Sequence, residues 1–482
     1  MYFRGTFVQC PNLGELEILD DWLIAIDNSG YITHFEPAQS SRSIDGLRRH
    51  QPIILPPGTF FLPPFNDLHL HAPQFLYQGN GLDLPLLEWL DKYAFKAEEE
   101  LDRNPTLARM VYRRLGQRLV KAGTGAVCLF GTLKGETNLI LAEEMQSVGI
   151  RAFVGKVSMD VSSRPTYVEP SSSVAIDAAR EFGEKLDQNN SHSRALKLVH
   201  PVITPRFVPT CSDELLQGLG GLSDEKGWRI QSHMAESSDQ VEWVKKERGE
   251  DDIPIFEKHN LLTPRTIQAH CTYLSPSSNS LSQQPSSKDP FIHLQNLGTA
   301  IAHCPLSNIY FSASRAFCLR EALEAHVKVG LGTDIAGGYS LDIMSAMRTA
   351  VAVSRIREGE RMERVRQGSQ SIDANRSGKP LAVDWKESLF LATLGGAQAL
   401  GIESGIFKVG APFDAQQIQL FDPTTRLGVG ALDFFEMEME NTQDINEFRG
   451  CLTTEMVEKW WCNGNERNRD AMYIQGIKLE GS

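Results

Sequence analysis

The segment FLPPFNDLHLH, residues 61–71, decides the fold, because it is an apolar run that ends in two histidines one residue apart. In a β-strand, residues i and i+2 point to the same face. His69 and His71 are therefore predicted to lie side by side at the carboxyl end of a strand over 61–69. Two such imidazoles can share a metal ion, although the pair alone also fits two structural histidines with ordinary hydrogen-bond partners.

Seven more short apolar runs follow and alternate with helical patterns. The helical patterns fill many of the intervals, with examples at 107–121, 173–186, 317–325 and 341–353. Alternation of strands and helices predicts an α/β protein with a parallel sheet. Eight repeats over about 340 residues predict a (β/α)8 barrel of the TIM type. The further strand runs are 125–130, 151–157, 196–203, 229–233, 266–270, 299–303 and 328–333.

Both ends of the chain carry short β patterns. Near the start these are 6–10, 16–19, 23–27 and 31–35, and Asn28-Ser29-Gly30 forms a hairpin turn between the last two. Near the end they are 405–410 and 415–421. We expect the two ends to pack together as a small β-sandwich domain. Residues 1–60 and 401–482 would form this domain, and residues 61–400 would form the catalytic barrel.

Composition excludes several classes of protein. The formal net charge of -13 argues against a nucleic-acid partner, which would call for excess Lys and Arg. The sequence has neither a signal peptide nor an apolar run of the roughly 18 residues that span a bilayer, so we expect no membrane association. The eight cysteines form no CxxC pair, which favours a cytoplasmic location. We expect 275–289 to be a surface insertion and 355–366 to be a solvated helix face.

Polar residues stand where the predicted strands end. In a barrel of this kind, the carboxyl ends of the strands meet at one rim, which carries the catalytic groups. Nitrogen and oxygen ligands with an open position for water suit catalytic Zn²⁺, so the sequence predicts one zinc ion in each subunit. Fe²⁺ can occupy similar ligands. The predicted ligands are His69, His71, His233, His270 and Asp334.

Two carboxylates are candidates for proton transfer. Asp334, beside the metal, can take the proton of the water, and Glu236, three residues after His233, can protonate a substrate nitrogen. The alternative for Glu236 is a carboxylate that stabilises the amino end of a helix. Some barrel hydrolases hold two metals with a carboxylated lysine after the fourth strand. Residues 204–207 contain no lysine, and Lys156 ends the third strand instead, so a single metal is favoured.

The sequence resembles the amidohydrolase superfamily and, more narrowly, the guanine deaminases. The resemblance covers almost the whole chain. The HxH and TD elements are shared across the superfamily, whereas LPLLEWL and TDIAGGYS are much narrower. The segments that carry the resemblance are DLHLHAPQF (67–75), LDLPLLEWL (82–90), TPRF (204–207), GTDIAGGYS (332–340) and GIFKVGAPFD (405–414).

The resemblance implies hydrolytic deamination of guanine to xanthine and ammonia by a zinc-activated hydroxide. It implies the five zinc ligands given above, Glu236 as proton shuttle, and a homodimer. It also implies guanine contacts from Gln74, Arg206 and Phe207, together with Glu236 and His270. Gln74 offers a donor and an acceptor to a purine edge, and Arg206 can donate to a carbonyl oxygen such as O6. Phe207 supplies a stacking surface or, alternatively, packs in the core.

Two other functions fit parts of this pattern. A sister aminohydrolase acting on a triazine or an adenine nucleoside would have the same metal site. A metal-free barrel used as a binding protein would lack ligands, whereas all the expected ligands are present here. Leu306 stands where many relatives are expected to have Asn. His303 could support a ligand or contact the substrate, and we do not expect it to bind the metal.

Overall fold

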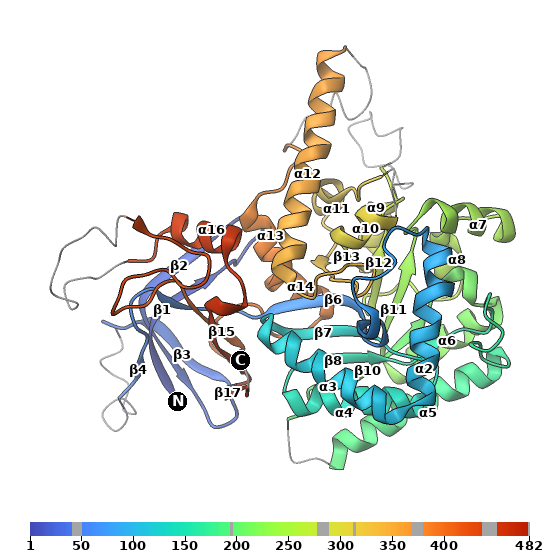
Figure 1. The fold of residues 1–482 in the computed structure, drawn as a ribbon, viewed down its shortest axis with the longest axis horizontal. Coiled ribbons are helices and arrows are strands. Elements are labelled where there is room, and N and C mark those ends of the chain that lie inside the picture. The colour runs from blue at the N-terminus through green and yellow to red at the C-terminus, as the bar shows by residue number, and fades with distance from the viewer. Residues whose placement is uncertain are drawn as a thin grey trace.

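The computed structural model describes residues 1–40, 51–192, 196–276, 289–311, 315–368, 379–435 and 451–480. Two sheets organise these residues, as Figure 1 shows: a barrel surrounded by helices, and beside it a smaller β domain that contains both chain ends. None of the helices in these ranges is long and apolar enough to cross a membrane.

The barrel consists of eight strands in which every neighbouring pair is parallel, which confirms the predicted fold. The first strand and the segment after the last one close the ring, because Asp334 N donates to His69 O at 2.8 Å and His71 N donates to Ile335 O at 3.0 Å. The strands are β6 (Phe65–His71), β7 (Thr124–Phe130), β8 (Arg151–Gly155), β10 (Val199–Pro205), β11 (Arg229–Met234), β12 (Thr266–His270), β13 (Ala300–His303) and β14 (Val329–Leu331), with the short β9 (Val157–Ser158) against β10.

The first expected strand, 61–69, is in fact two strands. Phe61 and Leu62 end β5 (Thr59–Leu62), which belongs to the small domain, and β6 begins at Phe65. Pro63 and Pro64 separate them, because proline lacks the N–H that a ladder requires. One apolar run therefore connects the two sheets.

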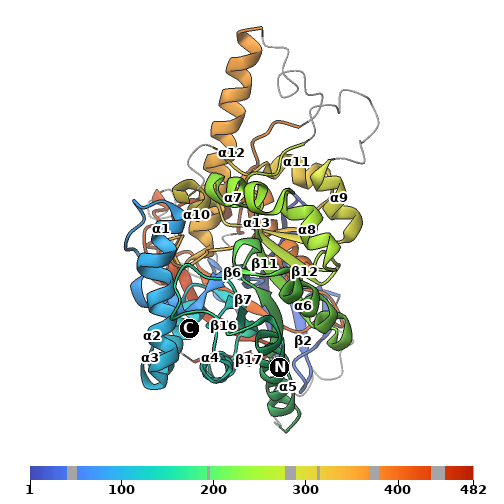
Figure 2. The same ribbon diagram turned by 90° about the vertical axis from the view of Figure 1, so that its right-hand side faces the viewer.

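Helices surround the barrel in both views (Figure 1 and Figure 2). Asn104 and Ser212 cap two of them by accepting from backbone N–H groups, as short polar side chains do at amino ends. The helices between strands are α3 (Pro105–Lys121), α4 (Gly135–Val148), α5 (Ser172–His192), α6 (Asp213–Lys226), α7 (Ser238–Arg248), α8 (Asp252–Lys258), α9 (Pro290–Leu297), α10 (Pro305–Phe311) and α11 (Leu319–Glu324). After β14 follow α12 (Ile343–Arg366), α13 (Trp385–Ala392) and α14 (Leu394–Leu400).

Helix α12 is longer than the predicted 341–353, because the mixed-charge run 355–366 continues it. Most of that run is exposed or half-buried, which confirms a solvated helix face. The far half of α12 projects away from the barrel (Figure 1 and Figure 2). Of the expected surface insertion at 275–289, residues 277–288 lie outside the described ranges.

A string of short helices follows β6 and leads the chain across the mouth of the barrel. These are the 3-10 helix η3 (Ala72–Tyr77), α1 (Leu86–Trp89), the π-helix η4 (Leu90–Ala94) and α2 (Phe95–Arg103). A further 3-10 turn, η5 (Val208–Thr210), follows β10. These elements bring residues 74–98 and 206–208 to the same end of the barrel as the histidines.

The small domain contains strands from both chain ends, as predicted. Its eight strands form one hydrogen-bonded sheet in the order β17-β16-β15-β5-β1-β2-β3, with β4 paired to β1. Aromatic rings fill its core, and Phe3 lies 5.0 Å from Phe61 and 5.6 Å from Phe413 between ring centroids. The strands are β1 (Tyr2–Gln9), β2 (Glu17–Ile26), β3 (Ile32–Pro37), β4 (Ile53–Ile54), β5, β15 (Ala415–Gln419), β16 (Arg469–Ile474) and β17 (Ile477–Lys478); α16 (Thr454–Asn463) and η6 (Glu466–Asn468) precede β16.

Two terminal segments differ from the predictions. The runs 16–19 and 23–27 are one continuous strand, β2, because Asp20 and Asp21 form a bulge between the residues that pair with β1, and their side chains accept from Thr6 and Arg4. The segment 405–410 is not a strand: Gly405 and Gly410 have positive φ angles, and the chain turns there. Phe407 nevertheless packs into the aromatic core of the domain.

Candidate metal centre and active site

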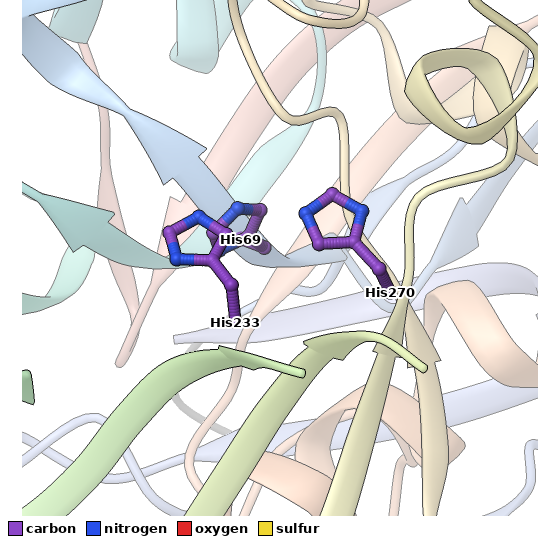
Figure 3. A group of neighbouring side chains, drawn as sticks. All are labelled: His69, His233 and His270. Atoms are coloured by element: carbon purple, nitrogen blue, oxygen red, sulfur yellow. The ribbon is translucent and has the colours of Figure 1, made fainter. Parts of the chain in front are cut away.

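The five predicted ligands lie together at the carboxyl rim of the barrel. Figure 3 shows the rings of His69, His233 and His270 approaching one another from their strands. His69 Nε2 is 3.1 Å from Asp334 Oδ1, and His71 Nε2 is 3.6 Å from the same oxygen. His270 Nε2 is 3.8 Å from Asp334 Oδ2. These residues are far apart in sequence, and the barrel alone brings them together.

Hydrogen bonds fix how two of these rings point. His233 Nδ1 donates to Arg206 O at 2.6 Å, and His270 Nδ1 donates to Asn308 Oδ1 at 2.9 Å. With the proton held on Nδ1, each ring turns an Nε2 lone pair toward the cluster, the arrangement that metal-binding histidines use. The Nε2 atoms of His69 and His270 are buried without a hydrogen-bond partner in the described structure.

The donor set fits a metal ion. His71 Nε2 lies 3.0 Å from His233 Nε2. His233 Nε2 carries a lone pair, because the proton of that ring is on Nδ1. Ligand atoms of His69, His233 and His270 lie within 4.8 Å of one another, as do those of His69, His71 and Asp334. A cation would satisfy the buried Nε2 atoms of His69 and His270, which have no hydrogen-bond partner among the described residues. Neutral imidazole nitrogens and a carboxylate oxygen are suitable ligands for zinc.

The electrostatics of the cluster point the same way. Burial, together with neighbouring histidines, lowers the pKa values of His69, His71 and His233 well below the usual range. These imidazoles are therefore neutral and able to bind a metal. Burial raises the pKa of Asp334, against the opposing effect of His270. A divalent cation would stabilise that carboxylate.

The backbone is strained where the strands deliver these groups. The φ angles of Asp334, His270, Cys271 and Ala235 are 49°, 70°, 53° and 45°, all in the left-handed region that non-glycine residues seldom adopt. Such strain persists only where the surrounding structure holds it, and it concentrates at functional sites. Asp67 is part of that structure: it accepts from Thr333 Oγ1 at 2.5 Å and Thr333 N at 3.0 Å.

Glu236 lies beside the cluster. Its Oε1 is 3.6 Å from His270 Nε2, and its carboxylate can share a metal or water site with His270 and Asp334. Burial raises the pKa of Glu236 well above the usual range, and the nearby Asp334 raises it further. A protonated carboxyl group at this position can donate a proton to a bound substrate. Glu236 also precedes α7, whose amino end is capped by Ser237, so it is not itself the cap.

A pocket opens onto this cluster and contains the expected substrate contacts. Gln74, Arg206 and Phe207 all line it, with His71, His233, Glu236 and Asp334. Its apolar surface comes from Leu86, Trp89, Leu90 and Phe311. The segment 82–90, quoted above for its narrow resemblance, thus forms part of the pocket wall.

Phe207 packs in the core, as one of its two interpretations expected, and it also lines the pocket, so that stacking on a ligand stays a prediction. The side chain is 4 % exposed and belongs to a hydrophobic core cluster, and it also faces the pocket. Its ring lies 6.3 Å from that of His233 in an edge-on arrangement. Packing therefore fixes a ring that a flat ligand can contact.

Three functional candidates were missed by reasoning from the sequence. Glu98 pairs with Arg206, Asn308 orients His270, and Asp252 accepts from Ala235 N at 2.7 Å. Glu98 stands in the run Glu98-Glu99-Glu100, which is typical of a solvated helix face. Only the fold shows that it is fully buried.

Two residues weighed earlier lie outside the pocket lining. Lys156 is buried and ion-paired with Glu169, so it has a structural partner instead of a metal. His303 packs against Phe317 with ring centroids 4.9 Å apart. Its Nδ1 atom has no hydrogen-bond partner in the described structure, and burial lowers its pKa to about 3.

Comparisons with known proteins agree with this geometry. A family model described as the amidohydrolase family matches residues 60–467. A guanine deaminase of Dictyostelium discoideum is 33% identical over 493 residues, covering 99% of this chain and 98% of that protein. A guanine deaminase of Homo sapiens is 35% identical over 485 residues, covering 99% and 96%. A crystal structure of guanine deaminase from C. acetobutylicum with bound guanine has a TM-score of 0.80 and 27% identity, covering 99% of both chains.

Proposed function

The chain belongs to the amidohydrolase family, and we propose that it hydrolyses guanine to xanthine and ammonia. One observation supports this most directly: Gln74 and Arg206 line the same pocket as Glu236, Asp334 and two histidines of the cluster, His71 and His233. A hydrogen-bonding wall for a purine edge therefore faces the groups that can carry out hydrolysis. The similar proteins named above, which cover nearly the full chain, support guanine as the substrate.

The metal in this proposal is one Zn²⁺ per subunit, held by His69, His71, His233, His270 and Asp334. Their converging, buried lone pairs support this ligand set. A zinc ion held there would supply Lewis-acid activation of a water molecule at neutral pH.

The protein's own residues then move the protons. Asp334 takes the proton that the attacking water gives up as it adds to C2 of guanine. Glu236, kept protonated by its buried position, donates to N3 as the tetrahedral centre forms. The Glu236 carboxylate then takes the proton of the new C2 hydroxyl and delivers it to the departing amine, so that ammonia leaves and xanthine remains. The proton held by Asp334 returns to Glu236, which restores both acids to their starting states.

Other residues bind and orient the ring. Arg206 donates to O6, Gln74 offers an N–H and an oxygen lone pair to the purine edge, and His270 lies beside the reacting carbon. The Phe207 ring limits how the base can tilt and helps to exclude water from the pocket. Holding the base in one pose against Glu236 lowers the entropic cost of the reaction.

The decisive experiment measures ammonia release from guanine, with and without a chelator, alongside adenine nucleosides and triazines. The proposal predicts release from guanine, its loss on metal removal, and its recovery when zinc is restored. Release from a triazine or an adenine nucleoside with silence on guanine would assign the site to a sister aminohydrolase. A chain that takes up no zinc would overturn the metal assignment.

We also infer a cytoplasmic homodimer. None of the eight cysteines, all of which lie in the described ranges, forms a disulfide, which suits a reducing compartment. The dimer rests on the family resemblance. Light scattering of the purified chain tests whether it is a dimer. Localisation of a tagged chain in cells tests whether it is cytoplasmic.

A further inference from the structure

Glu98 is a buried acid that no step of the proposed reaction uses. It lies on α2 (Phe95–Arg103), is 0 % exposed, and does not line the pocket. Two residues that do line the pocket, Arg206 and Gln74, both bind its carboxylate. One side chain behind the wall thus contacts both of the groups proposed to read the purine.

The contact with Arg206 is a two-point pair. Arg206 Nη1 donates to Glu98 Oε2 at 2.7 Å, and Arg206 Nη2 donates to Oε1 at 3.0 Å. The Arg206 guanidinium also lies 4.8 Å from the centre of the Phe95 ring. Arginine is not deprotonated in proteins, and the Glu98 carboxylate compensates its buried charge. The guanidinium is therefore charged, compensated and held in one plane, with N–H groups left over for a ligand.

The contact with Gln74 sets which end of its amide is the donor. Gln74 Nε2 donates to Glu98 Oε1 at 3.3 Å, while Gln74 Oε1 accepts from Ala336 N at 3.1 Å. A carboxylate can only accept and a backbone N–H can only donate, so the amide cannot be turned over without losing both bonds. One Gln74 N–H and one oxygen lone pair then remain for a ligand, in a fixed order.

From these contacts we infer that Glu98 is a positioning residue that holds Arg206 and Gln74 as one fixed array for the carbonyl edge of a 6-oxopurine. This inference rests on the proposed function. It goes beyond it by assigning the selectivity of the pocket to a side chain that does not touch the substrate. Because Glu98 and Arg206 neutralise each other, the array suits an uncharged base carrying a C6 carbonyl.

The test uses two ligands that differ at this edge and that have no amine to lose. Hypoxanthine carries the C6 carbonyl, and purine does not. A site built to hydrogen-bond a group discriminates strongly against an analogue that lacks it, so the wild-type zinc protein should bind hypoxanthine about 10- to 100-fold more tightly than purine. In Glu98→Gln this ratio of Kd values should fall to within about threefold, because the variant loosens Arg206 and can turn Gln74.

Glu99→Gln is the matched control. Glu99 is the next residue of α2, is buried at 4 % exposure, and also pairs with arginines, Arg103 and Arg164, but neither lines the pocket. This variant should keep the wild-type ratio. Zinc content and thermal unfolding of both variants establish that each is folded and loaded.

The outcomes separate the inference from the function beneath it. If the wild type releases ammonia from guanine and prefers hypoxanthine, and Glu98→Gln preserves that preference, the positioning role is wrong. Equal loss of affinity for both ligands in Glu98→Gln would reduce Glu98 to a structural residue and would also overturn the inference. A wild type that does not act on guanine would instead count against the proposed function. Glu98→Asp, which keeps the charge but shortens the reach, should recover part of the preference.

Discussion

The two sides of the pocket differ in whether their buried carboxylates are paired with a positive charge. On one side, which we call the α2 wall, Arg206 and Gln74 line the pocket, and Glu98 lies behind them, paired with the Arg206 guanidinium. On the other side, which we call the strand-end wall, Glu236, Asp334, His71 and His233 line the pocket, and His69 and His270 lie behind them. No lysine or arginine within the described ranges forms an ion pair with either acid of this wall. Burial consequently raises the pKa values of Glu236 and Asp334.

This contrast suits one pocket to two different ligands, an uncharged base and a divalent cation. The α2 wall is electrically complete, so adding another charge there would cost energy, and an uncharged base suits it. The strand-end wall lacks positive charge and has lone pairs in excess, so a divalent cation would complete it. Breaking either wall should therefore produce a different defect: loss of chemistry on one side and loss of selectivity on the other.

The largest effect should come from Glu236→Gln, which removes the proposed proton donor of the strand-end wall and keeps the shape of the side chain. We expect kcat for guanine to fall by about 10²- to 10⁴-fold, the usual contribution of a positioned acid or base. Zinc content should be unchanged. The control is Glu242→Gln, an exposed position on α7, which should behave as wild type. Near-normal turnover by a zinc-loaded Glu236→Gln protein would end the proton-transfer role.

A smaller effect should follow from Asn308→Ala, which removes the group that orients His270. Partners that hold a metal-binding histidine in place are worth about 10- to 100-fold in metal affinity. We therefore expect zinc affinity, measured by competition with a chromogenic chelator, to fall by that factor. Asn308→Asp retains an acceptor oxygen and should restore most of the affinity. Unchanged zinc affinity in Asn308→Ala would mean that the strand fixes His270 without help.

The strand-end wall could be predicted from the sequence, whereas the α2 wall could not. His69 and His71 share a face because of strand geometry, and the rim of a barrel collects the residues that end its strands. Glu98 and Arg206 are 108 residues apart, and the sequence around either residue does not predict that the two form an ion pair. Their pairing depends on how the chain from η3 to α2 crosses the barrel mouth, which is a matter of tertiary packing.

The fold also had parts that the sequence predicts and parts that it does not. All eight barrel strands were predicted, because strand–helix alternation is a repeated local pattern. The division of 61–69 at Pro63 and Pro64 was missed, since an apolar run does not say which of two sheets it joins. The sequence pattern predicts a strand at 405–410, where the structure has a turn, because apolar residues of this segment fill a core without pairing in a sheet. The domain boundaries at 60/61 and 400/401 stay a prediction.

A change on the α2 wall should affect binding more than chemistry. In Gln74→Glu, a second carboxylate oxygen would replace Nε2, which lies 3.3 Å from Glu98 Oε1, and the two acids would repel. We expect KM for guanine to rise about tenfold, a cost of the size of one lost hydrogen bond to a charged group, with a much smaller change in kcat. Gln117→Glu, an exposed position on α3, controls for the added charge. A fall in kcat at constant KM would contradict the division of labour between the walls.

The smallest effect concerns stability, at a carboxylate behind the strand-end wall. Asp252 accepts from Ala235 N and, like Glu236, has no lysine or arginine partner within the described ranges. Burial raises its pKa from 3.8 to about 7. The folded chain thus keeps a proton that the unfolded chain releases above its lower pKa, so this group lowers stability as pH rises from about 4 to about 7.

The slope is at most about 1.4 kcal/mol per pH unit, or roughly 1–2 °C in Tm for a chain of this size. Asp252→Asn cannot ionise, so the difference in Tm between the variant and the wild type should grow in the variant's favour between pH 5 and pH 7 and then level off. Thermal unfolding in buffers matched for ionic strength measures it. Asp239→Asn, a half-buried position on α7, supplies the control for the loss of one carboxylate near this site. A pH-independent difference for Asp252→Asn would show that Asp252 is already ionised in the folded chain, and that some positive charge reaches this wall after all.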